Sequence, residues 1–389
     1  MNIALNALSA RVGAGISAFV NLLPVLAKID KTNRYFIFLS NRQKEIWDII
    51  PETFRKVVIN YVPPNPYVRI IWEQIIFPFY ILFYSINILY SVGNTTTLLA
   101  PCKVLLLIEN SNPYSLLKIR WSKKERLRNK LLKYLGWLSA KRANKIRFVS
   151  NNSRNILVKQ LRIQPDKCVT IYHGFNDGSL GDKNNKKCVF GYNYILSVTT
   201  VAPHKNLDRL VEAFDVLVRR YKYSGNLLIV GDLCHSHYIE QLHSLVSRLN
   251  LNDRIIFAGK VAHKDIKYYY THADVFVLTS IEETFGMPLV EAMGYSVPVA
   301  VSDVSPLSAD KKYFIPFREI CGDAAHYFNP FDPNDIASGI YEIMYNQEYR
   351  EQLRSNGKKQ IKKYSWETTA KSLVKIFEEM RRSKCRSQK

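Results

Sequence analysis

Cysteine is scarce in this sequence, with six residues scattered at positions 102, 168, 188, 234, 321 and 385. No two of them stand at C-x-x-C spacing, which argues against the common zinc-binding patterns and against a disulfide framework. We therefore expect free thiols, as in a reducing cytosol. The sequence also contains no Asp-x-Asp motif, a point that bears on metal use below.

Acidic residues are few: 33 Asp and Glu stand against 55 Lys and Arg, which gives a formal net charge of +22. A charge of this size favours an acidic partner, such as a nucleic acid, an anionic membrane surface or a phosphorylated small molecule. Zinc-finger spacing and the aromatic signature of RNA-binding domains are both missing. We therefore expect no binding of nucleic acid.

Long hydrophobic runs are missing as well. The most apolar segment, Ile75–Tyr90, is interrupted by Pro78, Ser85 and Asn87. A membrane span needs about 20 apolar residues, so we predict a buried or interfacial helix ending near Tyr84, followed by a strand over Ile86–Tyr90. The amino terminus lacks a basic region followed by an apolar run, so no signal peptide is expected.

What is present is typical of a folded α/β protein. Hydrophobic residues make up 47% of the chain and charged residues 23%, and 389 residues predict two domains. Apolar runs alternate with helical patterns, which is typical of βαβ units and parallel sheets. The predicted strands are Ile3–Leu5, Tyr35–Leu39, Val57–Tyr61, Lys103–Ile108, Tyr194–Val198, Leu227–Val230, Arg254–Phe257, Val275–Leu278 and Val297–Val301.

A segment rich in Gly, Asn, Asp and Lys, Gly174–Lys187, is interpreted as the linker between the domains. The predicted domains are therefore residues 1–174 and 175–365. Residues 366–389 form a last helix and a basic tail.

The clearest chemical signal is the stretch Glu282–Gly294, which follows a strand ending at Ser280. Gly286 allows the backbone to approach a ligand closely. The helix that begins near Pro288 has free N–H groups and a positive dipole end, which together bind anions. Glu291, a turn inside, is placed to accept hydrogen bonds from two ribose hydroxyls. The alternative is a helix N-terminus that carries acids only for the dipole.

Two further loops follow strands. Lys205 stands near a helix N-terminus, where the dipole does not favour a cation; a bound diphosphate would explain it, and an exposed surface lysine is the alternative. Gly13-Ala14-Gly15 follows the first strand and is either a phosphate or acceptor loop or a plain tight turn. It is not G-x-G-x-x-G, so dinucleotide binding has little support.

Together these motifs resemble the family-4 retaining glycosyltransferases, most strongly from Tyr192 to Phe328. The family implies the GT-B fold, in which two Rossmann-like domains with parallel sheets face a central cleft and a C-terminal helix crosses back onto the first domain. The matching elements are Glu283–Glu291 (E-x7-E), the Pro-x-Lys-Asn turn at Lys205, Gly231-Asp232, Phe257-Ala258-Gly259, Ala273–Val277 and Gly322–Ala325. Trp72-Glu73-Gln74 and the small-residue loop are similar to the subgroup that builds bacterial polysaccharides.

The resemblance implies roles for these residues. Lys205 would neutralise the departing diphosphate, Glu291 would bind the ribose, and Glu283 would hold the donor sugar together with Thr284 and the backbone N–H groups of Phe285, Gly286 and Met287. Gly259 and Val261 would flank the base, and Gly15 would lie near the diphosphate or the acceptor. The family needs no bound metal or cofactor, in line with the missing Asp-x-Asp motif.

The sequence departs from the family at two points. The arginine that commonly precedes the lysine is missing, and His204 is the candidate replacement. The histidine that commonly follows a first-half strand is also missing. Glu109 or Asn110 would take its place as a catalytic residue beside the donor sugar; alternatively, both are turn residues bonded to their own backbone. His173 is interpreted as a hinge residue.

A basic region, Lys118–Arg147, holds twelve Lys or Arg and one acid, Glu125. Leucines at 127, 131, 135 and 138 follow helical spacing. A basic helix with an apolar stripe can lie on an anionic membrane, and the alternative is a stripe packed on the core.

These features predict a metal-independent, retaining hexosyltransferase that uses a nucleotide-diphosphate sugar. Its acceptor would be a growing polysaccharide or a lipid-linked saccharide, and it would act in the cytoplasm, at the inner face of the membrane. The alternatives are a nucleotide-sugar epimerase or another GT-B enzyme, and a non-enzymatic membrane-associated adaptor.

Overall fold

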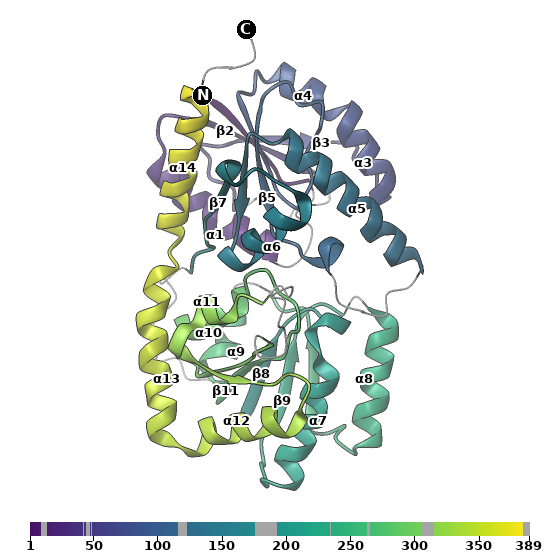
Figure 1. Ribbon diagram of the computed structural model, residues 1–389, viewed down its shortest axis with the longest axis vertical. Helices are drawn as coiled ribbons and strands as arrows, with labels where there is room; N and C mark the ends of the chain where they lie inside the picture. The colour runs from purple at the N-terminus through teal and green to yellow at the C-terminus, as the bar shows by residue number, and fades with distance from the viewer. Residues whose placement is uncertain are drawn as a thin grey trace. The chain divides into compact units, whose positions relative to one another are not determined.

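The computed structural model describes residues 1–8, 14–41, 43, 47, 49–115, 123–175, 193–233, 235–262, 265–304 and 315–383. The chain divides into two compact units, which are coloured along the chain in Figure 1. The first comprises Met1–Tyr114, Trp121–Gly174 and the chain from Ser365 onward; the second comprises Phe175–Tyr364 with the short segment Ser115–Arg120. The chain thus passes from one unit to the other at Gly174 and returns at Ser365.

The first unit is built on a parallel sheet of seven strands in the order β3-β2-β1-β4-β5-β6-β7. Ile3 of β1 pairs with Tyr35 of β2 on one side and with Ile88 of β4 on the other. The strand order therefore reverses between β1 and β4. The strands are β1 (Asn2–Asn6), β2 (Arg34–Ser40), β3 (Arg55–Ile59), β4 (Ile88–Ser91), β5 (Lys103–Ile108), β6 (Lys145–Phe148) and β7 (Cys168–Thr170).

The helices of this unit include the last helix of the chain. They are α1 (Ala14–Ile29), α3 (Pro66–Ile75), α4 (Phe77–Phe83), α5 (Lys123–Arg142), α6 (Asn151–Leu161) and α14 (Trp366–Arg382), with short 3-10 turns η1 (Asn112–Tyr114) and η2 (Pro165–Lys167). Helix α14 packs along α1. The buried ring of Phe377 lies 6.4 Å from Tyr35 and 6.3 Å from Tyr90. This apolar face ties the C-terminal helix to the first sheet.

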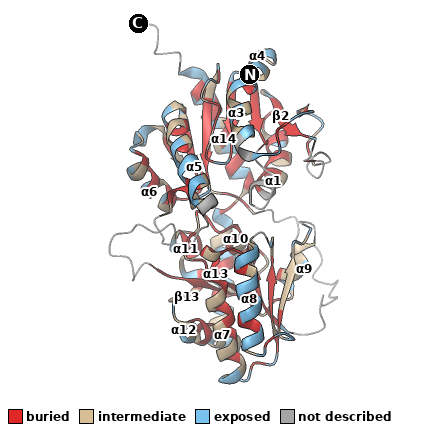
Figure 2. Cartoon of the chain, turned by 90° about the vertical axis from the view of Figure 1, so that its right-hand side faces the viewer, coloured by how far each residue is buried: buried red, intermediate tan, exposed pale blue. Residues whose placement is uncertain are grey.

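The second unit contains a parallel sheet of six strands in the order β10-β9-β8-β11-β12-β13. Its strands are β8 (Tyr194–Val198), β9 (Asn226–Val230), β10 (Ile255–Gly259), β11 (Val275–Leu278), β12 (Val299–Ser302) and β13 (Ala325–Phe328). The central strands are almost wholly buried, as Figure 2 shows in red, because helices cover both faces. Here the strand order reverses between β8 and β11.

The helices around this sheet are amphipathic. In α7 the residues Leu207, Leu210, Phe214 and Leu217 recur at helical spacing and are buried against the sheet and α12. The helices are α7 (Leu207–Arg219), α8 (Ser236–Arg248), α9 (Ile266–Thr271), α10 (Met287–Gly294), α11 (Phe317–Cys321), α12 (Pro333–Tyr345) and α13 (Gln347–Gln360), with 3-10 turns η4 (Pro203–Lys205), η6 (Gly322–Ala324) and η7 (Ile361–Lys363).

The predicted α/β class with two parallel sheets is confirmed. The helix predicted to end near Tyr84 corresponds to α4, which ends at Phe83, and the strand predicted after it starts at Ile88 instead of Ile86. The predicted linker lies outside the described residues from position 176 onward. Among the helices of the described ranges, none is long and apolar enough to cross a membrane.

Candidate active site

The second sheet presents a natural ligand position where its strand order reverses. In open parallel sheets, ligands bind at the carboxyl ends of the strands at this point. Strand β8 leads into the turn η4, which carries Lys205, and β11 leads into the loop that carries Glu283 and then into α10. Both motifs selected from the sequence therefore lie at the same edge of the same sheet.

Lys205 is held in place by its surroundings. Its backbone carbonyl accepts a hydrogen bond from the Thr279 hydroxyl at 2.9 Å, and the next residue, Asn206, takes a left-handed conformation (φ 56°) that starts α7. The Asn206 side chain donates to the carbonyl of Pro330 at 2.7 Å. Lys205 itself is 8% exposed, so the structure contradicts the alternative of an exposed surface lysine.

The Lys205 ammonium contacts both carboxylate oxygens of Glu283, at 2.9 and 3.0 Å. Their side chains are 9% and 20% exposed. A cation that is largely removed from water needs a partner, and Glu283 provides it in the ligand-free protein. The fold thus maintains a fixed positive charge beside the N-terminus of α10.

Helix α10 begins at Met287, after Gly286, which has φ +89°. This conformation favours glycine, and a Cβ atom at Gly286 would lie 2.9 Å from Cδ1 of Leu289, so the leucine side chain would also have to move. Pro288 has no N–H, and the N–H of Leu289 donates to the carbonyl of Gly286 at 2.9 Å, so a ligand at this end of the helix would meet the N–H of Met287, its first residue. The neighbouring Phe285, Thr284 and Met287 are buried, which fixes this backbone.

Glu291 lies one turn inside α10 and is only partly exposed. The hydroxyl of Tyr270 donates to its carboxylate at 2.7 Å. Burial raises the pKa of Glu291 to about 7, although the Tyr270 hydrogen bond opposes this shift. Tyr270 stacks on Tyr295, with ring centroids 5.4 Å apart, so the hydroxyl is well positioned. Tyr270 was not predicted from the sequence, because a tyrosine in a short helix carries no signal of its own.

His204 does not supply the positive charge considered for it in the sequence analysis. The residue is 9% exposed. Burial, with the charge of Lys205 beside it, holds the pKa of His204 well below its usual value. His204 is therefore a neutral imidazole at neutral pH. His204 therefore adds no positive charge beside Lys205.

The residues expected to flank a base follow strand β10 at the same edge. Gly259 ends the strand with φ +67°, and its carbonyl accepts a hydrogen bond from the N–H of Gly231 at 2.9 Å. A Cβ atom at Gly231 would lie 1.9 Å from the carbonyl oxygen of Thr199, so this glycine permits the close approach of the β8 and β9 ends. Val261 is half-buried just beyond Gly259.

The candidates of the first unit form a separate cluster at the end of β5. Glu109 lies near His173, with Oε2 and Nε2 3.4 Å apart. His173 is 3% exposed, and burial lowers the pKa of its imidazole. Its ring lies 5.6 Å from that of Trp366, the first residue of α14. Glu109 and His173 also line a small cavity with Tyr90, Arg147 and residues of α1.

Asn110 behaves as the turn residue considered for it as an alternative. Its side-chain oxygen accepts a hydrogen bond from the N–H of Asn112 at 3.0 Å. The buried Asn94 holds the same turn: its Oδ1 accepts from the N–H groups of Glu109 and Asn110, each at 3.0 Å. Asn94 was missed in the sequence, because only the fold brings it to this turn.

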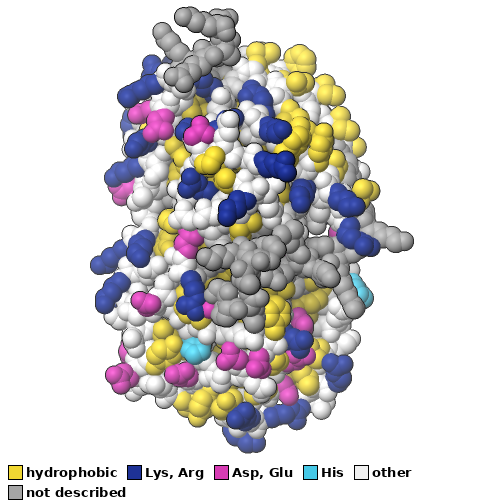
Figure 3. All heavy atoms as spheres, viewed as in Figure 1, with side chains coloured by type: hydrophobic (Ala, Val, Ile, Leu, Met, Phe, Trp, Pro, Cys, Tyr) yellow, Lys and Arg dark blue, Asp and Glu magenta, His cyan; other side chains and the backbone are white. Residues whose placement is uncertain are grey.

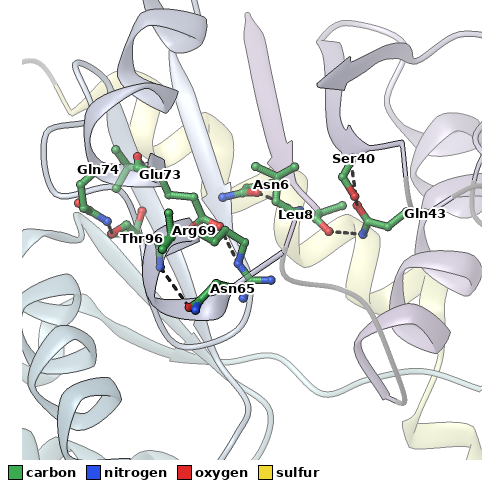
Figure 4. Close-up of polar contacts among 12 residues, drawn as sticks. Asn6, Leu8, Ser40, Gln43, Asn65, Arg69, Glu73, Gln74 and Thr96 are labelled. Atoms are coloured by element: carbon green, nitrogen blue, oxygen red, sulfur yellow. Dashed lines mark hydrogen bonds and ion pairs between the residues drawn. The ribbon is translucent and has the colours of Figure 1, made fainter. Parts of the chain in front are cut away.

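Polar side chains also gather at the carboxyl edge of the first sheet (Figure 4). Gln43 donates to the carbonyl of Ala7 at 2.6 Å, and Arg69 pairs with Glu73 at 3.4 Å. Gln74 accepts from the N–H of Leu98 at 2.7 Å. The last contact gives Gln74 of the Trp-Glu-Gln motif a structural role, because it anchors α3.

Two other expectations concern Gly15 and a metal site. Gly15 lies in the first turn of α1, where only its backbone is described, and Gly13 lies outside the described residues. Within the ranges that the structure describes, there is no group of three or more His, Cys, Asp or Glu side chains that could hold a metal ion.

The basic region is less uniform than its sequence indicates. Arg147 is not a surface cation: it lies in β6, is 1% exposed, and donates to the Tyr90 hydroxyl at 2.7 Å. Arg142 donates to the backbone carbonyls of Leu98 and Cys102. The exposed cations of the described part of this region are Arg126, Lys130, Lys133 and Lys141.

Comparisons with known proteins agree with this geometry. Residues 182–360 match the family model for glycosyl transferases of group 1. The O-antigen chain mannosyltransferase RfbU of Salmonella typhimurium is 30% identical over 211 residues, which cover 54% of each chain. The chain thus spans about half the length of the curated relatives it matches. Because these relatives are named as transferases, the comparison does not favour the epimerase or the adaptor alternative.

Solved structures show the same fold. Sucrose-phosphate synthase from Thermosynechococcus elongatus superimposes with a TM-score of 0.74 at 18% identity, covering 98% of this chain and 99% of its own. HepE of Anabaena, solved in complex with UDP-glucose, superimposes with a TM-score of 0.73 at 15% identity, covering 97% and 100%. These likenesses confirm the fold, and the family match over residues 182–360 agrees with the resemblance found in the sequence.

Proposed function

We propose that this chain, which over residues 182–360 belongs to the group 1 glycosyl transferases, moves a hexose from a nucleotide-diphosphate sugar to a saccharide acceptor. The observation that carries the proposal is the Lys205–Glu283 pair beside the N-terminus of α10. A buried ion pair, the start of α10 and a partly enclosed carboxylate, Glu291, lie along one sheet edge. A nucleotide-sugar has the matching order of groups: sugar, diphosphate and ribose.

Each part of the donor is bound by different residues. The diphosphate takes the place of the Glu283 carboxylate beside Lys205 and accepts hydrogen bonds from the backbone N–H groups of Gly286 and Met287 at the start of α10. Glu283, released from Lys205, accepts hydrogen bonds from hydroxyls of the donor sugar. Glu291 accepts hydrogen bonds from the ribose hydroxyls, and the base lies beside Gly259 and Val261. HepE, which shares the fold, binds UDP-glucose, and this supports a nucleotide-hexose donor.

The transfer retains the anomeric configuration. The bond between C1 and the leaving oxygen breaks as the nucleoside diphosphate departs. The acceptor oxygen bonds to C1 on the same face, and its proton passes to the departing phosphate. Lys205 and the α10 dipole stabilise the negative charge that develops on the leaving group, which is the main contribution to catalysis. No metal takes part in this scheme.

The acceptor is a growing polysaccharide or a lipid-linked saccharide. O-antigen mannosyltransferases among the relatives support a mannose-like hexose and an acceptor of this kind. The protein acts in the cytoplasm at the inner face of the membrane, with the exposed cations of α5 toward anionic lipid. In the first unit, Glu109 beside the buried His173 stays the candidate catalytic residue.

Calorimetric titration with UDP, GDP and dTDP, each with and without EDTA, tests the donor site. We expect micromolar binding of one nucleotide, unchanged by EDTA and lost in Glu291→Ala, because the ribose loses charge-assisted hydrogen bonds. Glu240→Ala, which alters an exposed glutamate of α8, is the matched control and should bind like the wild type. Binding of none of the three nucleotides by the wild type would contradict the proposal.

A further inference from the structure

The helices α3 and α4 carry an exposed apolar surface that the catalytic proposal does not use. It is visible in Figure 3 as yellow side chains over these helices in the upper right, with Lys and Arg beside them. Soluble proteins rarely expose large contiguous apolar patches without an interaction partner. The seven residues of this surface, termed the α3–α4 surface, are Val68 (50% exposed), Ile71 (59%), Ile75 (56%), Ile76 (38%), Phe79 (64%), Leu82 (60%) and Phe83 (79%).

These side chains are exposed because the two helices are apolar on more than one face. In α4 the residues Phe77 and Ile81, one turn apart, are buried, and Phe77 packs edge-on against Phe38 at 5.0 Å. Phe79, Leu82 and Phe83 face outward. A surface helix of a water-soluble protein normally carries polar residues on its outer face. The outer face of α4 therefore suits an apolar medium.

The charges around this surface are mostly positive. Between Phe54 and Ile108 the sequence contains a single acid, Glu73, which is paired with Arg69 on α3. Arg55, at the neighbouring strand β3, is exposed, and its guanidinium lies 5.1 Å from the ring centroid of Tyr84 at the end of α4. Apolar side chains bordered by cations match a membrane with anionic headgroups.

The segment from Thr96 to Cys102 connects this surface to the basic helix α5. Gln74 of α3 bonds to the backbone of Thr96 and Leu98, and Arg142 of α5 bonds to that of Leu98 and Cys102. Leu99, between these anchors, is 71% exposed.

Helix α5 repeats the same combination of apolar and basic side chains. Leu127 and Leu131 are 66% and 36% exposed, so this part of the leucine stripe does not pack on the core. Lys130 and Lys133 are exposed next to them.

We propose that the α3–α4 surface inserts into the boundary between headgroups and acyl chains of an anionic bilayer, with exposed cations of β3 and α5 on the phosphate headgroups. Helices of 10 and 7 residues are too short to span a bilayer, which needs about 20, so they would lie in its surface. This inference rests on the proposed function, which places the protein at the membrane, and adds the residues that make the contact. The inference identifies α3 and α4 as the part of the chain that enters the bilayer, and the positive charge alone does not identify it.

Co-sedimentation with vesicles of phosphatidylcholine, with and without phosphatidylglycerol, tests the inference on the full chain. We expect binding to vesicles that contain phosphatidylglycerol. The double variant Leu82→Ser/Phe83→Ser should bind at least about tenfold more weakly, because two large apolar side chains no longer leave water. Phe331→Ser, which alters an apolar residue of the second unit that is 48% exposed, is the matched control and should bind normally.

A second variant separates insertion from attraction of charge. Lys130→Glu/Lys133→Glu should weaken binding only to the anionic vesicles. Full binding by Leu82→Ser/Phe83→Ser would overturn insertion while leaving an electrostatic contact, and no vesicle binding by the wild type would overturn the membrane contact itself. If the wild type is a dimer in solution and Leu82→Ser/Phe83→Ser is a monomer, a second copy of the chain covers the α3–α4 surface, and the inference is overturned. Nucleotide titration of the same samples reports separately on the donor site.

Discussion

Glu291 is the residue whose chemistry is most sensitive to pH in this account. Its pKa of about 7 means that the carboxyl group is close to half protonated at neutral pH in the ligand-free protein. Ribose hydroxyls donate hydrogen bonds to the ionised form, so a bound nucleotide stabilises the carboxylate and releases a proton. A group in this position links ligand binding to pH in the same way that shifted groups link folding to pH.

We therefore predict that nucleotide affinity increases as the pH rises through about 7, with proton release on binding. Glu291→Gln should remove this dependence. Calorimetry in buffers of different ionisation enthalpy measures the released protons. The terminal phosphate of the nucleotide titrates in both proteins, so its contribution cancels in the difference between them. Equal proton release by wild type and variant would contradict the assignment.

At the residue scale, sequence patterns located the charged groups and left their pairings open. Lys205 and Glu283 were predicted because each follows a strand end, yet they are 78 positions apart and only the fold shows that they contact each other. The neutral state of His204 depends on burial, which a histidine next to a lysine does not reveal. Arg147 was counted with the surface cations, but it is buried and donates to the Tyr90 hydroxyl of β4 and to the carbonyl of Ile171, just after β7.

At the scale of elements, the start of α10 is the critical position. Gly286→Ala places a Cβ atom 2.9 Å from Cδ1 of Leu289 in a backbone with φ +89°. We expect a loss of about 1–3 kcal/mol in the free energy of unfolding. Nucleotide binding should weaken as well, because the N–H groups at the start of α10 shift. Denaturant unfolding and nucleotide titration measure the two effects.

Gly357→Ala is the matched control for this change. Gly357 lies inside α13, where a Cβ atom would meet Met293 at an ordinary 3.6 Å. Alanine is favoured over glycine in a helix by about 1 kcal/mol, so this variant should be as stable as the wild type or more stable. If Gly286→Ala unfolds and binds nucleotide like Gly357→Ala, the α10 N-terminus does not hold the phosphates.

Strands and helices could be predicted from the sequence where burial gave them a regular pattern of apolar residues. Strands β8, β9, β11 and β12 read as largely apolar runs, because helices cover both faces of the sheet. Strand β13 was missed because its sequence, Ala-His-Tyr-Phe, is not a continuous apolar run. Strand β6 was missed because its sequence, Lys-Ile-Arg-Phe, resembles the end of the basic helix before it. Helix α3 was missed because it starts at Pro66, directly after a Pro-rich loop. Its outer face is also apolar, so it lacks the usual polar half of a helical pattern.

At the scale of the whole molecule, two parallel sheets each reverse their strand order near the middle, and the last helix returns to the first sheet. The alternation of strands and helices was sufficient to predict this class. The identity of the sugar, the base and the acceptor depends on side chains that border the bound ligands, and no periodicity in the sequence encodes them. The central claim is therefore the reaction class, carried by Lys205 and its surroundings.

The most direct test of this claim is the release of nucleoside diphosphate from UDP-, GDP- and dTDP-hexoses, with lipid-linked saccharides from bacterial membranes as acceptor. We predict EDTA-resistant release from one of these donors. Lys205→Ala should reduce turnover by about a hundredfold or more, because the leaving group loses its counter-charge. Lys358→Ala, at an exposed position of α13, should leave turnover unchanged. Release from none of the donors, or undiminished turnover in Lys205→Ala, would contradict the account.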